Sequence, residues 1–494
     1  MQHIKKHLQR RICIASVYAL GEKRCHKVTA ALLAILIVVS AICPAAMAQD
    51  VMAASVAEAS NQIDELTKQL LLKEIELERF NLHYVLEAAK QGRWKGWRYA
   101  GAQEVNTGLN LTGGIISTVN RGRYLHNAKG VKLGPQEAAN YIPMIGSIIG
   151  ASAAAAEFNI NVYHELMAKK HGYSPGVSLA KVKTLKDQIY SLMDKRNALI
   201  EIEAMQPEFA KHVLVDRAEG KLLQDNLDQT LKEFARYHVS ARRLLAFQQA
   251  QYLIDAGKYS TNAIGAYFAY LSLARKQRIW NGRAGVLFAV SGQMTMWGPI
   301  ISRLYGKGVS IIASRRVNAI MRDQADASIA TLQTDLAALD KIVNKGSASE
   351  AALGSATEKE TIFEENERAF SEEIRTAQKR ANAAKLTATQ NIGAGIFVGG
   401  SKTASSVLFL IPGYDNRYNT KTARAGKVTN ELLFSSAVVG LPAGGFSMAD
   451  TLRIQVMGEI ARHKAAKKGI LPAQIAATRL KKLDDMEERL KQIH

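Results

Sequence analysis

The sequence predicts an all-α protein in which long amphipathic, coiled-coil-like helices alternate with three glycine-rich apolar helical hairpins. Only nine of the 494 residues are proline, so most of the chain can continue a helix without a break. Charged stretches place apolar residues at alternating steps of three and four, the spacing of one helix face. Between these stretches lie three segments rich in apolar and small residues, and a short basic tip interrupts each of them.

Residues 1–48 are predicted to be a secretory signal peptide. A basic segment precedes an almost unbroken apolar run at 28–42, and Ala46-Met47-Ala48 places small residues before a cleavage site at Gln49. The basic segment is longer than usual, so an uncleaved N-terminal anchor is the alternative. A lipoprotein is disfavoured, because the residue before Cys43 is isoleucine where lipoprotein processing requires a small residue.

The predicted cleavage would change both the cysteine content and the net charge of the chain. All three cysteines lie in residues 1–48, so we expect no disulfide and no cysteine-based metal site after cleavage. The signal carries seven Lys or Arg and one Glu, which leaves about +15 of the net charge of +21 on the rest. For an exported chain this favours anionic lipid or an acidic envelope protein as partner, and nucleic acid is not expected. The alternative is that the charge only keeps long helices soluble.

The first amphipathic helix is expected within residues 49–100. Ile63, Leu70, Leu77 and Tyr84 are seven residues apart and form a one-sided apolar stripe. Such a helix needs a partner for this face.

A coiled-coil hairpin is expected at residues 177–256, with a turn before Pro207 because the residue before a proline disfavours the helical conformation. Its second helix has the clearest seam, and His238 in this seam is expected to be a packed core histidine. The seam predicts self-association by coiled-coil packing. The seam consists of Leu227, Leu231, Phe234, His238, Ala241, Leu245, Gln248 and Tyr252.

Two further amphipathic segments follow the same spacing. A second coiled-coil hairpin is expected at residues 316–388, with a flexible polar turn at 344–349. A C-terminal amphipathic helix is expected at residues 451–494, where Leu483 and Leu490 are seven residues apart.

The three apolar hairpins share one order of features. Each has an apolar arm, a tip with four basic residues, and a second apolar arm that contains a proline. This order predicts an internal triplication, and the alternative is three independent hairpins of similar composition. The hairpins are expected at residues 101–166, 257–315 and 389–450, with prolines at Pro143, Pro299 and Pro442.

The hairpins predict partial membrane insertion. Their second arms approach the roughly 20 apolar residues that a span requires, whereas the first arms of the first two hairpins are shorter. Lys402 lies in the longest arm, where a charge costs on the order of 3 kcal/mol unless it faces protein or water. Small residues four apart predict close helix packing. These pairs are Gly146 and Gly150, Gly395 and Gly399, and Gly440 and Gly444.

Trp94, Trp97 and Arg98 precede the first hairpin and are candidates for an interfacial girdle of aromatic and cationic side chains. The alternative is that the two tryptophans cap a soluble core. If the three hairpins instead pack into one soluble helical head, their arms form its core and their tips are solvated.

No recognisable catalytic, cofactor or metal site is present. Lys402 follows a glycine-rich stretch, but Ser401 separates the last glycine from the lysine, unlike a phosphate-binding loop. His164-Glu165 lacks the second histidine of a zinc protease. We therefore predict no catalytic residue, no cofactor and no metal ligand, and do not expect an enzyme.

The function expected from these features is that of an exported bacterial envelope protein, a membrane-associated helical scaffold in the periplasm. The first alternative is an oligomeric pore-forming or translocation component in which Lys402 faces a lumen. The second alternative is a soluble periplasmic helical binding module.

Overall fold

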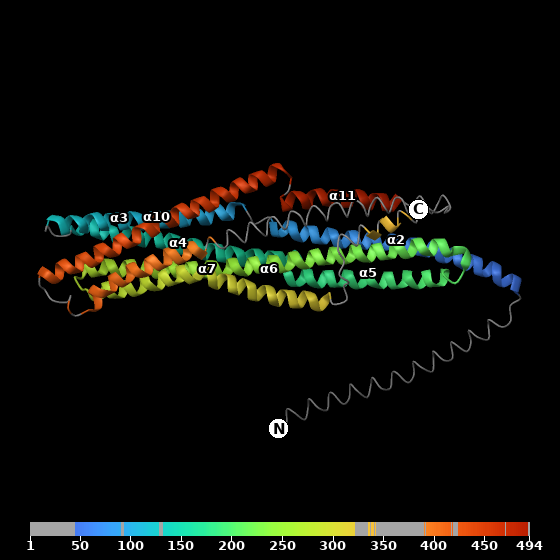
Figure 1. Cartoon of the computed structure of the whole chain (residues 1–494), viewed down its shortest axis with the longest axis horizontal. Coiled ribbons are helices and arrows are strands. Elements are labelled where there is room, and N and C mark those ends of the chain that lie inside the picture. The colour runs from blue at the N-terminus through green and yellow to red at the C-terminus, as the bar shows by residue number, and fades with distance from the viewer. Residues whose placement is uncertain are drawn as a thin grey trace, which may run out of the picture. The chain divides into compact units, whose positions relative to one another are not determined.

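In the computed structural model every secondary-structure element of the described residues is a helix, which confirms the all-α prediction (Figure 1). Residues 1–44 of the signal predicted at 1–48, and most of the hairpin predicted at 316–388, lie outside the described residues. The described residues are 45–89, 93–127, 132–321, 334–335, 337–339, 341, 390, 392–415, 417, 423–469 and 471–492.

Most helices are much longer than one hairpin arm. The longest is α6, with 65 residues, and it follows a turn and the short 3-10 helix η1 that begins at Pro207. The helices are α2 (Ala45–Ala89), α3 (Arg93–Asn127), α4 (Leu133–Lys170), α5 (Pro175–Glu203), η1 (Pro207–Phe209), α6 (Ala210–Ala274), α7 (Ile279–Ile320), a helix at Ile392–Tyr414, α10 (Ala423–Lys467) and α11 (Pro472–Gln492).

Amphipathic segments and apolar arms are parts of the same helices. The changes in composition expected at 256/257, 315/316 and 450/451 fall inside α6, α7 and α10, respectively. At these points the sequence changes between charged and apolar segments, but the helix continues through each of them. Even Pro143, Pro299 and Pro442 lie inside α4, α7 and α10 and do not end them.

The chain divides into two compact units, Met1–Thr67 with Asp194–Val213, and Lys68–Met193 with Leu214–His494. In the smaller unit Ile63, Ile200 and Val213 form a small apolar cluster. Arg196 Nε donates a hydrogen bond to Thr67 Oγ1 at 2.7 Å, and both side chains are buried.

In the larger unit, residues 68–89, 175–193, 214–250 and 472–492 form a region that we call the stalk. Its core is apolar, and Leu70, Leu77, Ile189, Leu222 and Leu231 are all fully buried. Leu227, Leu231 and Phe234 of the predicted α6 seam belong to this core together with residues of α2, α5 and α11, whereas Ala241, Leu245 and Gln248 of the seam are half-buried.

Polar contacts join α11 and α6 to α2 in the stalk. Arg79 of α2 lies 2.7 Å from Asp484 Oδ1 and 2.5 Å from Glu487 Oε2 of α11. Asn226 of α6 donates to Glu74 Oε2 at 2.7 Å, and both side chains are buried. Burial raises the pKa of Glu74 to about 8, although the Asn226 hydrogen bond opposes the shift.

The larger unit also contains the head, by which we mean the described residues of 101–166, 257–315 and 389–450. It consists of three hairpins: α3 with α4, the end of α6 with α7, and Ile392–Tyr414 with α10 (Figure 1). The α3 helix packs along both α4 and α10, so the first and third hairpins are neighbours.

The head has its polar side chains inside and its large apolar side chains outside. Its buried apolar residues are mostly alanines, such as Ala154 and Ala284. Buried polar residues, each at most 5% exposed, include Asn106, Gln136, Ser147, Glu157, Asn161, Asn262, Ser291, Ser302, Ser406 and Ser436. Large apolar residues, each at least 44% exposed, include Ile148, Ile301, Leu304, Phe397, Val407 and Phe446.

Four helical segments of the described chain are long and apolar enough to cross a membrane. In each of them at most 28% of the apolar window is buried inside the protein, so most of the apolar surface needs another covering. The head therefore has the character of a membrane-associated domain. The four segments are Leu133–Glu203, which includes α4 and α5, Ile279–Ile320, Ile392–Tyr414 and Arg424–Lys467.

Candidate functional site

The interior of the head contains a cavity of about 290 Å³ to which all three hairpins contribute. Side-chain amides and hydroxyls line much of it, together with two lysines, Lys258 of α6 and Lys402 of the Ile392–Tyr414 helix. No aspartate or glutamate is among the described residues that line it. The lining of the cavity therefore combines polar and apolar groups and includes two basic side chains.

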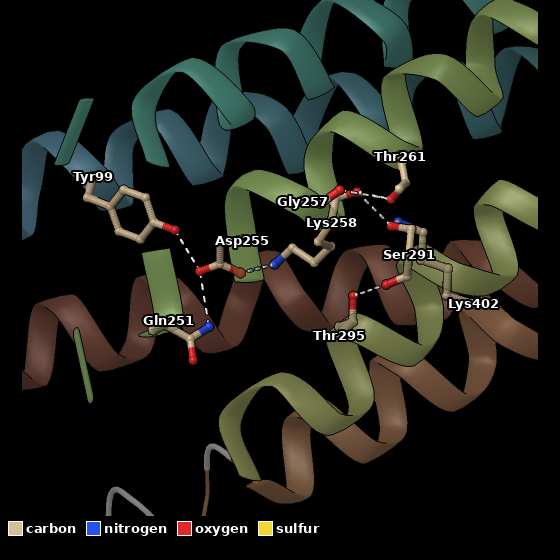
Figure 2. Close-up of polar contacts among 9 residues, drawn as sticks. All are labelled: Tyr99, Gln251, Asp255, Gly257, Lys258, Thr261, Ser291, Thr295 and Lys402. Atoms are coloured by element: carbon tan, nitrogen blue, oxygen red, sulfur yellow. Dashed lines mark hydrogen bonds and ion pairs between the residues drawn. The ribbon is translucent and has the colours of Figure 1, made fainter. Parts of the chain in front are cut away.

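Lys258 belongs to a buried polar cluster beside the cavity, shown in Figure 2. Its Nζ donates to Asp255 Oδ1 at 2.6 Å, and the two side chains are 14% and 3% exposed. Tyr99 OH donates to Asp255 Oδ2 at 2.6 Å, and Gln251 Nε2 donates to the same oxygen at 3.0 Å. Asp255 is thus the counter-ion of Lys258 and accepts hydrogen bonds from three side chains.

Lys402 has only a neutral partner among the described residues. Its Nζ donates to Ser291 Oγ of α7 at 2.9 Å, and Ser291 Oγ donates to the Lys258 backbone carbonyl at 3.0 Å (Figure 2). Ser291 therefore connects the second and third hairpins through one hydroxyl group. The expectation that the Lys402 charge must face protein or water agrees with its place on the cavity wall.

Asn262 connects the first and second hairpins. Its Nδ2 donates to Ser147 Oγ of α4 at 2.6 Å and to Asn110 Oδ1 of α3 at 3.2 Å. The Asn110 amide in turn donates to Asn106 Oδ1 at 2.7 Å. This chain of amides crosses three helices and satisfies polar groups that would be costly to bury alone.

Gly146 and Gly150 lie where α4 approaches two other helices. A Cβ added at Gly146 would lie 2.9 Å from Leu109 Cβ of α3, and one at Gly150 would lie 3.0 Å from the Tyr259 ring of α6. Both glycines are buried. The predicted small-residue pair therefore contacts a different helix at each position.

Gly395 and Gly399 pack against the backbone of α7. An added Cβ would lie 3.2 Å from the Thr295 carbonyl oxygen at Gly395 and 2.5 Å from the Met296 amide nitrogen at Gly399. The sequence analysis missed the matching small residues of α7. A side chain at Gly292 would collide with Thr403 and Gly399.

The third pair makes looser contacts. An added Cβ would lie 3.5 Å from Ser405 Oγ at Gly440 and 3.3 Å from Leu111 Cδ1 at Gly444. Gly444 therefore lies at the packing of α10 on α3, whereas Gly440 has ordinary van der Waals space.

The predicted girdle makes polar contacts with other helices. Trp97 is 41% exposed and its Nε1 donates to Glu459 Oε1 of α10 at 3.1 Å. Arg98 Nε donates to Glu157 Oε1 of α4 at 2.5 Å, and the Glu157 side chain is 2% exposed. Trp94 lies in the first turn of α3.

Residues that sequence analysis did not single out supply most of the site. Asp255 and Lys258 are spaced like an ordinary solvated pair on a helix, so their spacing alone does not indicate a buried cluster. One feature of the sequence could have indicated them. These charged and amide residues lie beside small residues at the start of an apolar stretch, where polar side chains are expected to face protein.

Within the described residues no group of three or more His, Cys, Asp or Glu side chains is arranged to hold a metal ion. No protein-family model matches the chain, and comparison with curated proteins finds no match.

Proposed function

We propose that this protein is an exported, non-enzymatic scaffold of the bacterial envelope, with its head inserted in a membrane and its stalk in the periplasm. The observation that carries the proposal is the reversed polarity of the head, with apolar side chains outside and amides, hydroxyls and lysines inside.

This distribution fits hydrocarbon better than water. Ile148, Val407 and Phe446 are each at least 44% exposed, although large apolar side chains are normally covered by protein or by a membrane. Inside a bilayer, polar groups must find partners within the protein, as Asn262 and Ser291 do. Glycine and serine at helix contacts provide the close packing that replaces hydrophobic burial there.

The stalk supplies the interaction surface of the proposed scaffold. The N-terminal part of its apolar seam is buried within the chain, so we expect self-association or partner binding to use the half-buried rest of the seam and the charged outer faces of the helices. The positive balance of the chain favours an acidic envelope protein or anionic lipid as partner. Cleavage before Gln49 would remove the first four residues of α2 and leave the rest of that helix intact.

Site-specific fluorescence tests insertion directly. The processed chain would contain no cysteine, so Val407→Cys in the head and Leu214→Cys in the stalk each provide one attachment site for an environment-sensitive dye. The two side chains are similarly exposed, 48% and 55%. In reconstituted vesicles we expect blue-shifted emission, protected from an aqueous quencher, at Val407→Cys only. Equal quenching at both positions contradicts insertion.

Localisation and processing need a separate measurement. The N-terminus of the protein purified from membranes should begin at Gln49, and carbonate should not extract it whereas detergent should. A soluble pool beginning at Gln49 would instead support the soluble binding module.

A translocation component is the second candidate, because Lys402 lines a polar cavity inside the head. In an oligomer such a cavity would supply a lumen wall. Release of dye from anionic vesicles distinguishes the candidates, since a scaffold binds the vesicle without leakage. Leakage that Lys402→Met alters would favour translocation.

A further inference from the structure

The tip end of the head contains a second cavity, of about 280 Å³. Residues of all three hairpins line it, and it shares Asn140, Phe409 and Leu433 with the cavity described above. Three cations line it: Arg121 of α3, and Lys276 and Arg278 of the turn between α6 and α7. We call it the tip cavity.

Arg121 is a buried cation held by neutral groups. Its side chain belongs to a residue that is only 6% exposed, Nη1 donates to Asn430 Oδ1 at 2.8 Å, and Nε lies 3.4 Å from Ser117 Oγ. No carboxylate forms an ion pair with it among the described residues. Burial of a guanidinium costs several kcal/mol unless a negative charge compensates it, so this arrangement lacks an anion.

Arg278 also has a donor that lacks a partner. Its Nη1 is buried and has no hydrogen-bond partner within the described part of the chain. Guanidinium groups present donors in a fork that matches the oxygens of phosphate or carboxylate. A free donor of this kind beside the tip cavity is an observation that points to a ligand.

Lys276 has an unfavourable backbone conformation in the turn between α6 and α7. Its φ of 52° lies in the left-handed region, which favours glycine or asparagine and is unfavourable for a residue with a longer side chain. The chain nevertheless has a lysine in this turn. Asn140, Asn281 and Asn430 add carboxamide groups to the lining, and the described lining contains no acidic residue.

We propose that the tip cavity binds a phosphate-type oxyanion, held by the guanidinium groups of Arg121 and Arg278 and the ammonium group of Lys276. The anion is either free phosphate or the phosphate headgroup of an acidic lipid, since both present the same oxygens. The inference is independent of membrane insertion, because binding is measurable in detergent solution.

The test uses the full-length protein in a maltoside detergent, which contains no phosphate. Thermal unfolding is followed with increasing sodium phosphate, against sodium chloride of equal ionic strength. We expect a saturable rise of the midpoint in the wild type and at least tenfold weaker binding in Arg278→Gln and Arg121→Gln. Arg123→Gln is the matched control, because Arg123 is exposed on α3 and does not line the cavity. It should bind phosphate like the wild type.

A second arm identifies the source of the anion. Mixed micelles containing dioleoyl phosphatidic acid are compared with micelles containing a neutral galactolipid with the same acyl chains. Stabilisation by phosphatidic acid alone, lost in Arg278→Gln, assigns the site to a lipid headgroup. Stabilisation by phosphate that the lipid does not compete with assigns it to a free anion.

Two results would overturn the proposal. One is the absence of stabilisation by either probe, and the other is equal stabilisation of the wild type and Arg278→Gln. If Arg121→Gln does not fold because its side chain is buried, Arg278→Gln decides, since that residue is partly exposed.

Discussion

Arg479 of α11 forms an ion pair with Glu78 of α2, and each side chain is only 7% exposed. The same guanidinium lies 3.9 Å from Glu233 Oε2 of α6. One buried cation thus links the C-terminal helix to two helices of the stalk. The apolar contacts of Leu483 and Leu490 complete the docking of α11.

Replacement of this cation should release the C-terminal helix. Arg479→Gln leaves the Glu78 carboxylate buried without its counter-ion, which typically costs about 3–5 kcal/mol. We expect limited proteolysis to remove α11 early in this variant. Lys481→Gln, on the exposed face of the same helix, should be cut at the wild-type rate.

The double replacement of the ion pair separates charge from packing. Arg479→Met with Glu78→Leu removes both charges and keeps apolar volume, a change that is often neutral or stabilising in a core. We expect it to restore protection of α11. Cleavage as fast as in Arg479→Gln would contradict the explanation that an uncompensated Glu78 carboxylate releases the helix.

Glu74 should make stability depend on pH. Its pKa is about 8 in the folded protein and near 4.5 when unfolded, so the folded state keeps a proton that the unfolded state loses. The stabilisation from this group is complete below pH 4.5 and is lost as the pH rises to 8. Glu74→Gln should therefore stabilise the protein at pH 8, by roughly 1–3 kcal/mol, and change little at pH 4.5.

Denaturant unfolding between pH 4.5 and 8 measures this effect. Gln at position 74 can still accept the hydrogen bond from Asn226. Glu76→Gln is the control, because its side chain is 44% exposed and forms an ion pair with Lys73 in the same helix. Parallel stability curves for the wild type and Glu74→Gln would contradict the raised pKa.

The helix of Ile392–Tyr414 should tolerate a side chain at Gly400 but not at Gly399. The Gly399→Ile side chain would run into the backbone of α7 at Met296, and overpacking of this kind costs roughly 1–3 kcal/mol. No described atom lies within 4 Å of a Cβ added at Gly400, so Gly400→Ile adds the same volume without a clash. Thermal unfolding in detergent should separate the two, and equal midpoints would refute the close approach of these helices.

The amide bridge between the first two hairpins should show energetic coupling. Asn262→Leu and Ser147→Ala each remove the hydrogen bond between them, so a double-mutant cycle should give a coupling of about 0.5–2 kcal/mol. Thr112→Val should show none with Asn262→Leu, because the Thr112 hydroxyl bonds to the Gly108 carbonyl of its own helix. Additive free energies of unfolding for the first pair would exclude the bridge.

The stalk follows from its sequence more directly than the head does. Scarce prolines and the Leu227–Leu231 spacing indicate helices and their buried face, because in water apolar side chains turn inward. The turn before Pro207 is likewise predictable from backbone sterics. Which helices would cover the seam could not be predicted, since a heptad pattern does not tell a partner in the same chain from one in another.

In the head, the rule that apolar side chains turn inward does not hold. Asn262 and Ser291 are turned inward there, and Ile301 is turned outward, so hydrophobic periodicity marks the outer face rather than the core. Small residues such as Gly399 identified helix contacts, but their partners on α7 depend on tertiary packing. The cluster of Asp255 and Lys258 required the structure, because it gathers residues from separate helices.

The continuity of α6 has a mechanical consequence. Leu227 is fixed in the stalk core and Lys258 stands at the head cavity, about 46 Å further along one uninterrupted helix at 1.5 Å per residue. An intact helix resists twisting and stretching, so a torque or pull applied to the stalk reaches the cavity wall as a rotation or shift of Lys258 and Asn262. One continuous helix therefore connects the stalk to the head, so a force that displaces one region changes the geometry of the other.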